Sequence, residues 1–203
     1  MPDEVSRAIE SRRSVRHFDD EHVSRDIVQD LIRLACTAPA PHHSRPWRFV
    51  HVTSDERREA LSDAMSDSWR ADLDAANTPV REVDRLLRRS HAQVTEAPAL
   101  LVACLALDEA NEWPDDHRKQ SERDMFVQSL GAALQNILIA AGDFGLVGYL
   151  KGAPLFCADA IRTALDLPDG WEPTFLVLLG YPQPGFEPGP RPAIEIADFM
   201  IER

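Results

Sequence analysis

Three arginines and a serine fall within five positions near the start of the chain, at Arg12, Arg13, Ser14 and Arg16. Guanidinium groups bind phosphate and carboxylate oxygens in pairs, because their N–H groups form a rigid planar fork. Together with a hydroxyl, this cluster could surround a phosphate. A solvent-exposed basic corner paired with surface carboxylates is the alternative interpretation. Arg191, a single arginine between prolines, indicates nothing by itself.

A second candidate site is the segment 38–49, which reads Ala-Pro-Ala-Pro-His-His-Ser-Arg-Pro-Trp-Arg-Phe. Its three prolines favour an extended backbone from which polar side chains project. The side chains that could line a ligand ring are His42, His43, Ser44 and Arg45. A rigid loop that only leads into a strand is the alternative. No metal site is predicted, because adjacent histidines seldom converge on one ion and no third ligand is evident.

Glycines recur at 145, 148 and 152, directly after the longest helical pattern. Because glycine has no Cβ, backbone N–H groups at such positions can approach a flat cofactor closely. The order is not the GxGxxG of dinucleotide-binding proteins, and the segment follows a helix instead of opening one. A Rossmann fold is therefore not predicted, and ordinary turns are the alternative interpretation of these glycines.

The elements that must position these segments follow from the hydrophobic pattern. Helices are predicted at 3–12, after Ser24 as N-cap, within the charged stretch 55–91, at 122–141 and at 156–166. Strands are predicted at about 47–53, 99–107 and 175–179. The run 99–107 is apolar throughout, which predicts a strand covered on both faces. Residues 108–120 are predicted to form an exposed loop.

Composition limits the class of protein. The 203 residues, of which 44% are hydrophobic, suit one domain over 1–203. A net charge of −12 disfavours nucleic acid and acidic membrane surfaces as partners. No signal peptide is evident and no apolar run approaches about 20 residues, so we expect a cytoplasmic protein. The isolated cysteines, expected to be reduced core thiols, are Cys36, Cys104 and Cys157.

Taken in order, the motifs resemble those of the nitroreductase superfamily of flavoproteins. Arg12 to Phe18 match its Arg-Arg-Ser-x-Arg-x-Phe phosphate motif, and Ala38 to Phe49 match its Ala-Pro-Ser-x-x-Asn-x-Gln-Pro-Trp-x-Phe loop. Gln135-Asn136 matches a pair in its small-residue helix. The resemblance covers nearly the whole chain. It implies an α+β fold with a mixed, mainly antiparallel sheet surrounded by helices, and an intertwined homodimer with two FMN sites at the interface.

The resemblance also assigns roles to individual residues. The residues that would hold or lie near the FMN phosphate are Arg12, Ser14, Arg191, Arg13 and Arg16. Those that would reach the flavin ring or ribityl chain from the partner subunit are Pro41, His42, His43 and Arg45. The backbone around Val147 and Gly148 would donate toward flavin N5.

Within this family the chain resembles most the C-terminal FMN domain of the coenzyme F420 ligase protein, through segments 38–46, 123–136 and 165–173. The resemblance implies an FMN-dependent oxidoreductase that transfers hydride from reduced flavin to a small or deazaflavin-type substrate. We expect a reductase of coenzyme F420 biosynthesis, acting on dehydro-F420-0. Two alternatives stay open: a broad NAD(P)H-dependent nitro or quinone reductase, and a non-catalytic flavin or deazaflavin carrier.

Departures from the family motifs concern the substrate. His43 and Arg45 replace the usual asparagine and glutamine of the loop, and Lys151 introduces a charge after the glycine segment. Arg45 and Lys151 are therefore candidates for holding an anionic substrate, although both could point to solvent. NAD(P)H or a reduced deazaflavin is the expected electron donor.

Overall fold

A four-stranded antiparallel sheet forms the centre of the computed structural model, which describes residues 3–203. In the order in which they pair, the strands are β1 (Trp47–His51), β2 (Ala99–Ala106), β4 (Trp171–Gly180) and β3 (Val147–Lys151). The helices are α1 (Glu4–Ser11), α2 (Arg25–Ala35), α3 (Asp55–Ala75), α4 (Val80–Thr95), α5 (Asp116–Ala140) and α6 (Ala158–Ala164). Short 3-10 turns are η1 (Pro41–His43), η2 (Ala141–Phe144), η3 (Ala153–Phe156) and η4 (Ile196–Asp198).

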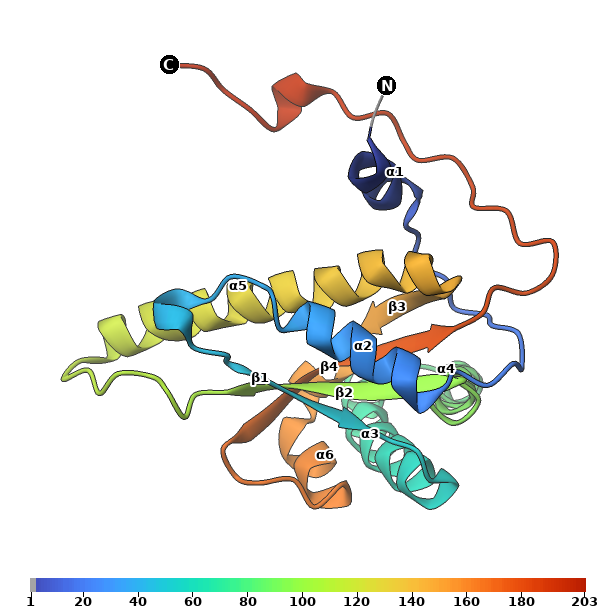
Figure 1. Ribbon diagram of the computed structural model, residues 1–203. Coiled ribbons are helices and arrows are strands. Elements are labelled where there is room, and N and C mark those ends of the chain that lie inside the picture. Colours follow the sequence, from blue (N-terminus) through green and yellow to red (C-terminus); the bar gives the residue numbers. More distant parts are fainter. Residues whose placement is uncertain (1–2) are drawn as a thin grey trace.

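Helices cover both faces of this sheet (Figure 1). α2 and α5 lie on one face, where Leu101 of β2 packs against Phe126 and Leu134. α3, α4 and α6 lie on the other face, where Leu100 packs with Leu61. Every residue of β2 is buried, which confirms the predicted doubly covered strand. The α+β prediction is likewise confirmed. All paired strands are antiparallel, however, and the recorded parallel contact is the isolated bridge between Ser14 and Gly148.

The long helix α5 starts earlier than its apolar pattern predicts. The side chain of Asp115 accepts a hydrogen bond from the Arg118 amide, so this N-cap starts the helix within the segment predicted to be loop. Extended by η2, the helix is also long and apolar enough to cross a membrane, which the sequence analysis did not anticipate. Some of its apolar side chains pack on the sheet, and 44% of the apolar window is buried.

The glycine segment 145–152 forms a strand and not only a turn, which corrects the sequence-based interpretation. Gly145, with φ of 70°, makes the turn after η2, and β3 follows as an edge strand of the sheet. A Cβ at Gly148 would lie 2.5 Å from the Leu178 carbonyl oxygen and 2.6 Å from Leu179 Cδ2. Glycine is thus required at 148 by close packing against β4.

We expect Gly148→Ala to lower the free energy of unfolding by about 1–3 kcal/mol, because the added methyl group must displace the backbone of β3 or β4. Gly142→Ala is the matched control, since a Cβ there would meet no atom within 4 Å. Urea unfolding of the two variants measures the difference. Equal stabilities would show that β3 and β4 are less closely packed than described.

The two terminal segments lie together and away from the sheet (Figure 1). No residue of α1 is buried, and residues 183–203 are all exposed. The large apolar side chains of the tail that remain exposed are Phe186, Ile194, Ile196, Phe199, Met200 and Ile201. Within residues 3–203, this apolar surface therefore has no covering element.

Candidate functional site

The tail is tied to the end of α1 by two arginines. Arg191 Nε donates to the Glu10 carbonyl at 3.2 Å, and Arg191 also donates to the Arg12 carbonyl. Arg13 Nη1 donates to the Glu10 carbonyl at 2.7 Å, and its Nε donates to the Gly189 carbonyl at 3.2 Å. The last carbonyls of a helix lack partners within the helix, and these guanidinium groups supply them. The structure thus brings Arg191 to the Arg12–Ser14 segment, from 179 residues away in sequence.

These residues line an open cavity of about 390 Å³. Its lining includes Arg12, Arg13, Ser14 and Arg191 together with prolines and Phe186 of the tail, and it includes no carboxylate. Among residues 3–203, no hydrogen bond or ion pair occupies the Arg12 guanidinium, because Arg12 is hydrogen-bonded through its backbone alone. A cavity with three guanidinium groups, a hydroxyl and no acid is suited to a multiply charged anion.

The cavity adjoins the free edge of β3. Ser14 bridges Gly148, and the Val15 amide donates to the Gly148 carbonyl at 3.2 Å. Because backbone groups alternate sides along an antiparallel strand, the amide and carbonyl of Leu150 point toward the same edge. The outward carbonyl of Gly148 already has a partner, so the next backbone groups along this edge are those of Leu150.

Arg16 lies apart from the other arginines of the motif. Its guanidinium carbon is 5.3 Å from the centroid of the Tyr149 ring, within the range of a cation–π contact. It lines a second cavity together with Arg89 and Gln93 of α4.

The proline-rich loop is exposed and conformationally restricted. His42 and His43 have φ values of 54° and 57°, in the left-handed region, and both side chains are exposed, as is Arg45. Ser44 is buried, and its hydroxyl donates to the Pro41 carbonyl at 2.6 Å, so its side chain holds the turn and does not line a ligand site.

This loop and the glycine edge lie at opposite ends of α5 (Figure 1). Arg45 lines the same small crevice as Phe126, whereas β3 follows η2, which ends at Phe144. At 1.5 Å per residue, these positions are roughly 27 Å apart along the helix. Within one chain, the structure therefore does not bring the loop residues to the arginine cavity.

Lys151 points to the α3–α4 side of the sheet, away from Arg45. Its Nζ donates to Ser90 Oγ at 2.7 Å and to Gln93 Oε1 at 3.1 Å. Burial, with a smaller contribution from the charge of Arg89, lowers the pKa of the Lys151 ammonium to about 8. Ser90 and Gln93 were missed by the sequence analysis, because they belong to a charged helix that carries no motif.

Comparisons with known proteins agree with this fold. The Nitroreductase family model matches residues 9–181. A Methanothermobacter thermautotrophicus protein provisionally named an NADH dehydrogenase/NAD(P)H nitroreductase is 26% identical over 88% of this chain and 78% of its own length. The 5,6-dimethylbenzimidazole synthase of Rhodospirillum rubrum is 29% identical over 95% of this chain and 87% of its own. The crystal structure of a BluB-like flavoprotein from Clostridium difficile 630 has a TM-score of 0.78, with 21% identity over 99% of this chain and 100% of that one.

Proposed function

Because the chain belongs to the Nitroreductase family and is an oxidoreductase of that family, we propose that it is a homodimeric FMN enzyme that reduces nitro or quinone compounds with NAD(P)H. The arginine cavity is the observation that carries this proposal. Arg13 and Arg191 donate hydrogen bonds to backbone carbonyls, whereas the guanidinium of Arg12 is available to a phosphate. Ser14 adds a hydroxyl on the same wall.

The free edge of β3 is suited to the flat ring of the cofactor. FMN, when bound, supplies the two-electron chemistry, and the protein supplies position and electrostatics. The ring would lie beside β3, with the ribityl chain running from the phosphate cavity. Gly148 is bridged to Ser14, and Val147 turns its backbone groups toward β4, so we expect the outward amide of Leu150 to be the donor to the ring.

A second copy of the chain is needed to complete this site. Pro41, His42, His43 and Arg45 are too distant in their own chain, so in the proposed dimer they approach the flavin from the partner subunit. Gln128, Gly131 and Gln135 form an exposed face on successive turns of α5. Glycine in that face lets another backbone approach closely. The exposed apolar tail gives a second surface for the same partner.

The substrate class is chosen from the relatives. One is named for NAD(P)H-dependent nitro reduction, another for 5,6-dimethylbenzimidazole synthesis, and the solved structure is named a flavoprotein. The first of these names favours an NAD(P)H-dependent nitroreductase, and none of the three names coenzyme F420, which the sequence motifs suggested. No feature of the arginine cavity favours a deazaflavin substrate over a nitro compound or quinone.

Turnover by the purified enzyme tests this proposal. The FMN-loaded protein is mixed with NADPH or NADH, and then with a nitroaromatic, a quinone or dehydro-F420-0. We expect NAD(P)H to be oxidised with the first two acceptors. Reduction of dehydro-F420-0 alone would reverse the choice of substrate. Absence of turnover with all three acceptors would reject the reductase proposal.

A further inference from the structure

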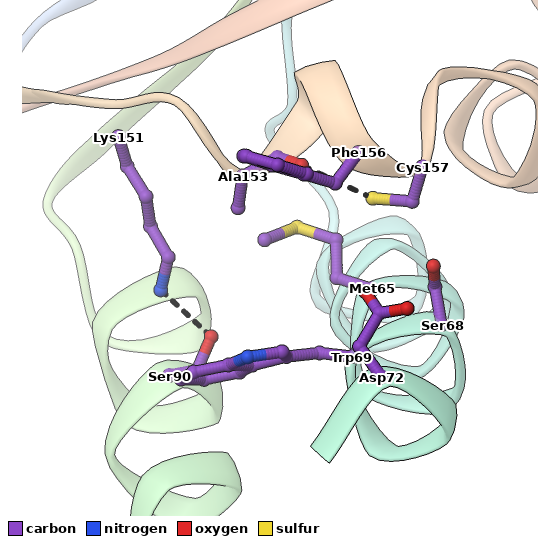
Figure 2. A pocket seen from close by; sticks show the side chains of 9 residues that line it. All are labelled: Met65, Ser68, Trp69, Asp72, Ser90, Lys151, Ala153, Phe156 and Cys157. Atoms are coloured by element: carbon purple, nitrogen blue, oxygen red, sulfur yellow. Dashed lines mark hydrogen bonds between the residues drawn. The ribbon is translucent and has the colours of Figure 1, made fainter. Parts of the chain in front are cut away.

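A separate cavity of about 340 Å³ lies between α3, α4 and η3, on the side of the sheet opposite α5. Figure 2 shows the rings of Trp69 and Phe156 on opposite sides of this cavity, with Met65 between them at one end and Lys151 along another side. Most of the lining is apolar. A volume at the lower end of the range for ligand pockets suits a small aromatic ligand.

Lys151 provides a positive charge that no described carboxylate pairs with directly, although Asp72 also lines the cavity. An ammonium group has three N–H donors, and those of Lys151 meet two acceptors, Ser90 Oγ and Gln93 Oε1. Among residues 3–203, no third acceptor bonds to Nζ and no carboxylate lies within 4.0 Å of it. A partly buried cation with a spare donor is stabilised by an anionic ligand.

Two other charged groups lie at or near the cavity, Arg89 and Asp72. Arg89 of α4 adds positive charge near Lys151. The pKa of the Cys157 thiol is raised mainly by burial and also by the negative charge of Asp72 on α3. The Cys157 thiol donates to the Ala153 carbonyl at 3.4 Å, so it is engaged with its own turn. Positive charge therefore lies at the Lys151 side of the cavity and negative charge at the side of Asp72 and Cys157.

We propose that this cavity recognises a single-ring aromatic anion, with the ring between Trp69 and Phe156 and its carboxylate or phenolate on Lys151. The proposal concerns recognition of the anion and not its reduction. Recognition itself needs only the described residues. A neutral ring of the same shape would bind through the aromatic walls alone and leave the third N–H of Lys151 without a partner.

Calorimetric titration of the FMN-loaded protein with 4-nitrobenzoate and 4-nitrobenzamide tests the proposal. The two ligands have similar shapes, but only the first is anionic. We expect the wild type to prefer 4-nitrobenzoate by about tenfold, which is a free-energy difference of about 1.4 kcal/mol. Lys151→Met should abolish that preference. Lys119→Met is the matched control, because Lys119 is exposed on α5 and is the other of the two lysines in the chain.

A pH titration of the wild type covers the case in which Lys151→Met does not fold. 4-Nitrobenzoate keeps its charge above neutral pH, whereas Lys151 loses its proton as the pH rises through its pKa of about 8. The preference for the anion should therefore decline between pH 7 and 10, with Asp72, Arg89 and Cys157 as the other charged or titratable groups at the cavity.

Equal affinity for the two ligands in the wild type, or a preference retained by Lys151→Met, would overturn the proposal. Failure of the proposed function gives a different result. In that case 4-nitrobenzoate still binds with the expected dependence on Lys151 and pH, although the protein shows no NAD(P)H-dependent turnover.

Discussion

Arg12→Ala is expected to weaken FMN binding by about 10- to 150-fold, since a charge-assisted hydrogen bond contributes about 1.5–3 kcal/mol. The expectation follows from the geometry of the arginine cavity. Arg12 has an unengaged guanidinium, so its removal deletes a phosphate contact and leaves the hydrogen bonds of Arg13 and Arg191 in place. The melting temperature of the flavin-free protein should therefore change little.

Riboflavin, which lacks the phosphate, separates this effect from a general disturbance of the site. Fluorescence titration should give the same riboflavin affinity for Arg12→Ala and the wild type. Arg7→Ala is a matched control, because Arg7 is exposed on the same helix and does not line the cavity. A parallel loss of FMN and riboflavin affinity would assign Arg12 a structural role instead.

Gly131→Glu is expected to convert the protein to a folded monomer that does not retain FMN. A Cβ at Gly131 would meet no atom within 4 Å in the described chain, so the fold of one subunit tolerates the larger side chain. Replacement of a helical glycine also favours the helix by a few tenths to about 1 kcal/mol. If α5 packs closely against a second copy at this position, a buried unpaired carboxylate would prevent association.

Sedimentation velocity and the absorbance of bound flavin measure the two consequences together. Ala71→Glu is the control, because it adds the same charge at an exposed position in the C-terminal part of α3. It should remain dimeric and retain flavin. A dimeric Gly131→Glu variant that keeps its flavin would remove this face of α5 from the proposed interface.

Local patterns were sufficient to predict much of the fold. Ser24 caps α2 by accepting from the Ile27 amide, as expected of a serine before an amphipathic run. The unbroken apolar pattern of β2 predicts its double coverage, because alternate residues contact different helices. β3 could not be predicted in the same way. Glycine is required at 148 because Leu178 and Leu179, some 30 residues later, pack closely against it, and no local sequence pattern indicates that contact.

The sequence predicted those site residues that are adjacent in one motif. It did not predict those that the fold brings together from distant parts of the chain. Arg12, Arg13 and Ser14 are adjacent in sequence and share one cavity, whereas Arg16 turns to Tyr149. The connection of Arg191 to this segment came from the resemblance alone, since nothing near it indicates a site. The neighbours of Lys151 lie on α4, about 60 residues earlier, and depend on how that helix packs against β3.

Flavin stoichiometry of the purified protein tests the central claim most directly. Absorbance of the protein as isolated, followed by saturation with FMN and gel filtration, gives the number of flavins bound per chain. The arginine cavity beside the free edge of β3 predicts a yellow protein with about one FMN per chain, whose absorbance is bleached by NAD(P)H. A colourless protein that takes up no added FMN would contradict the account.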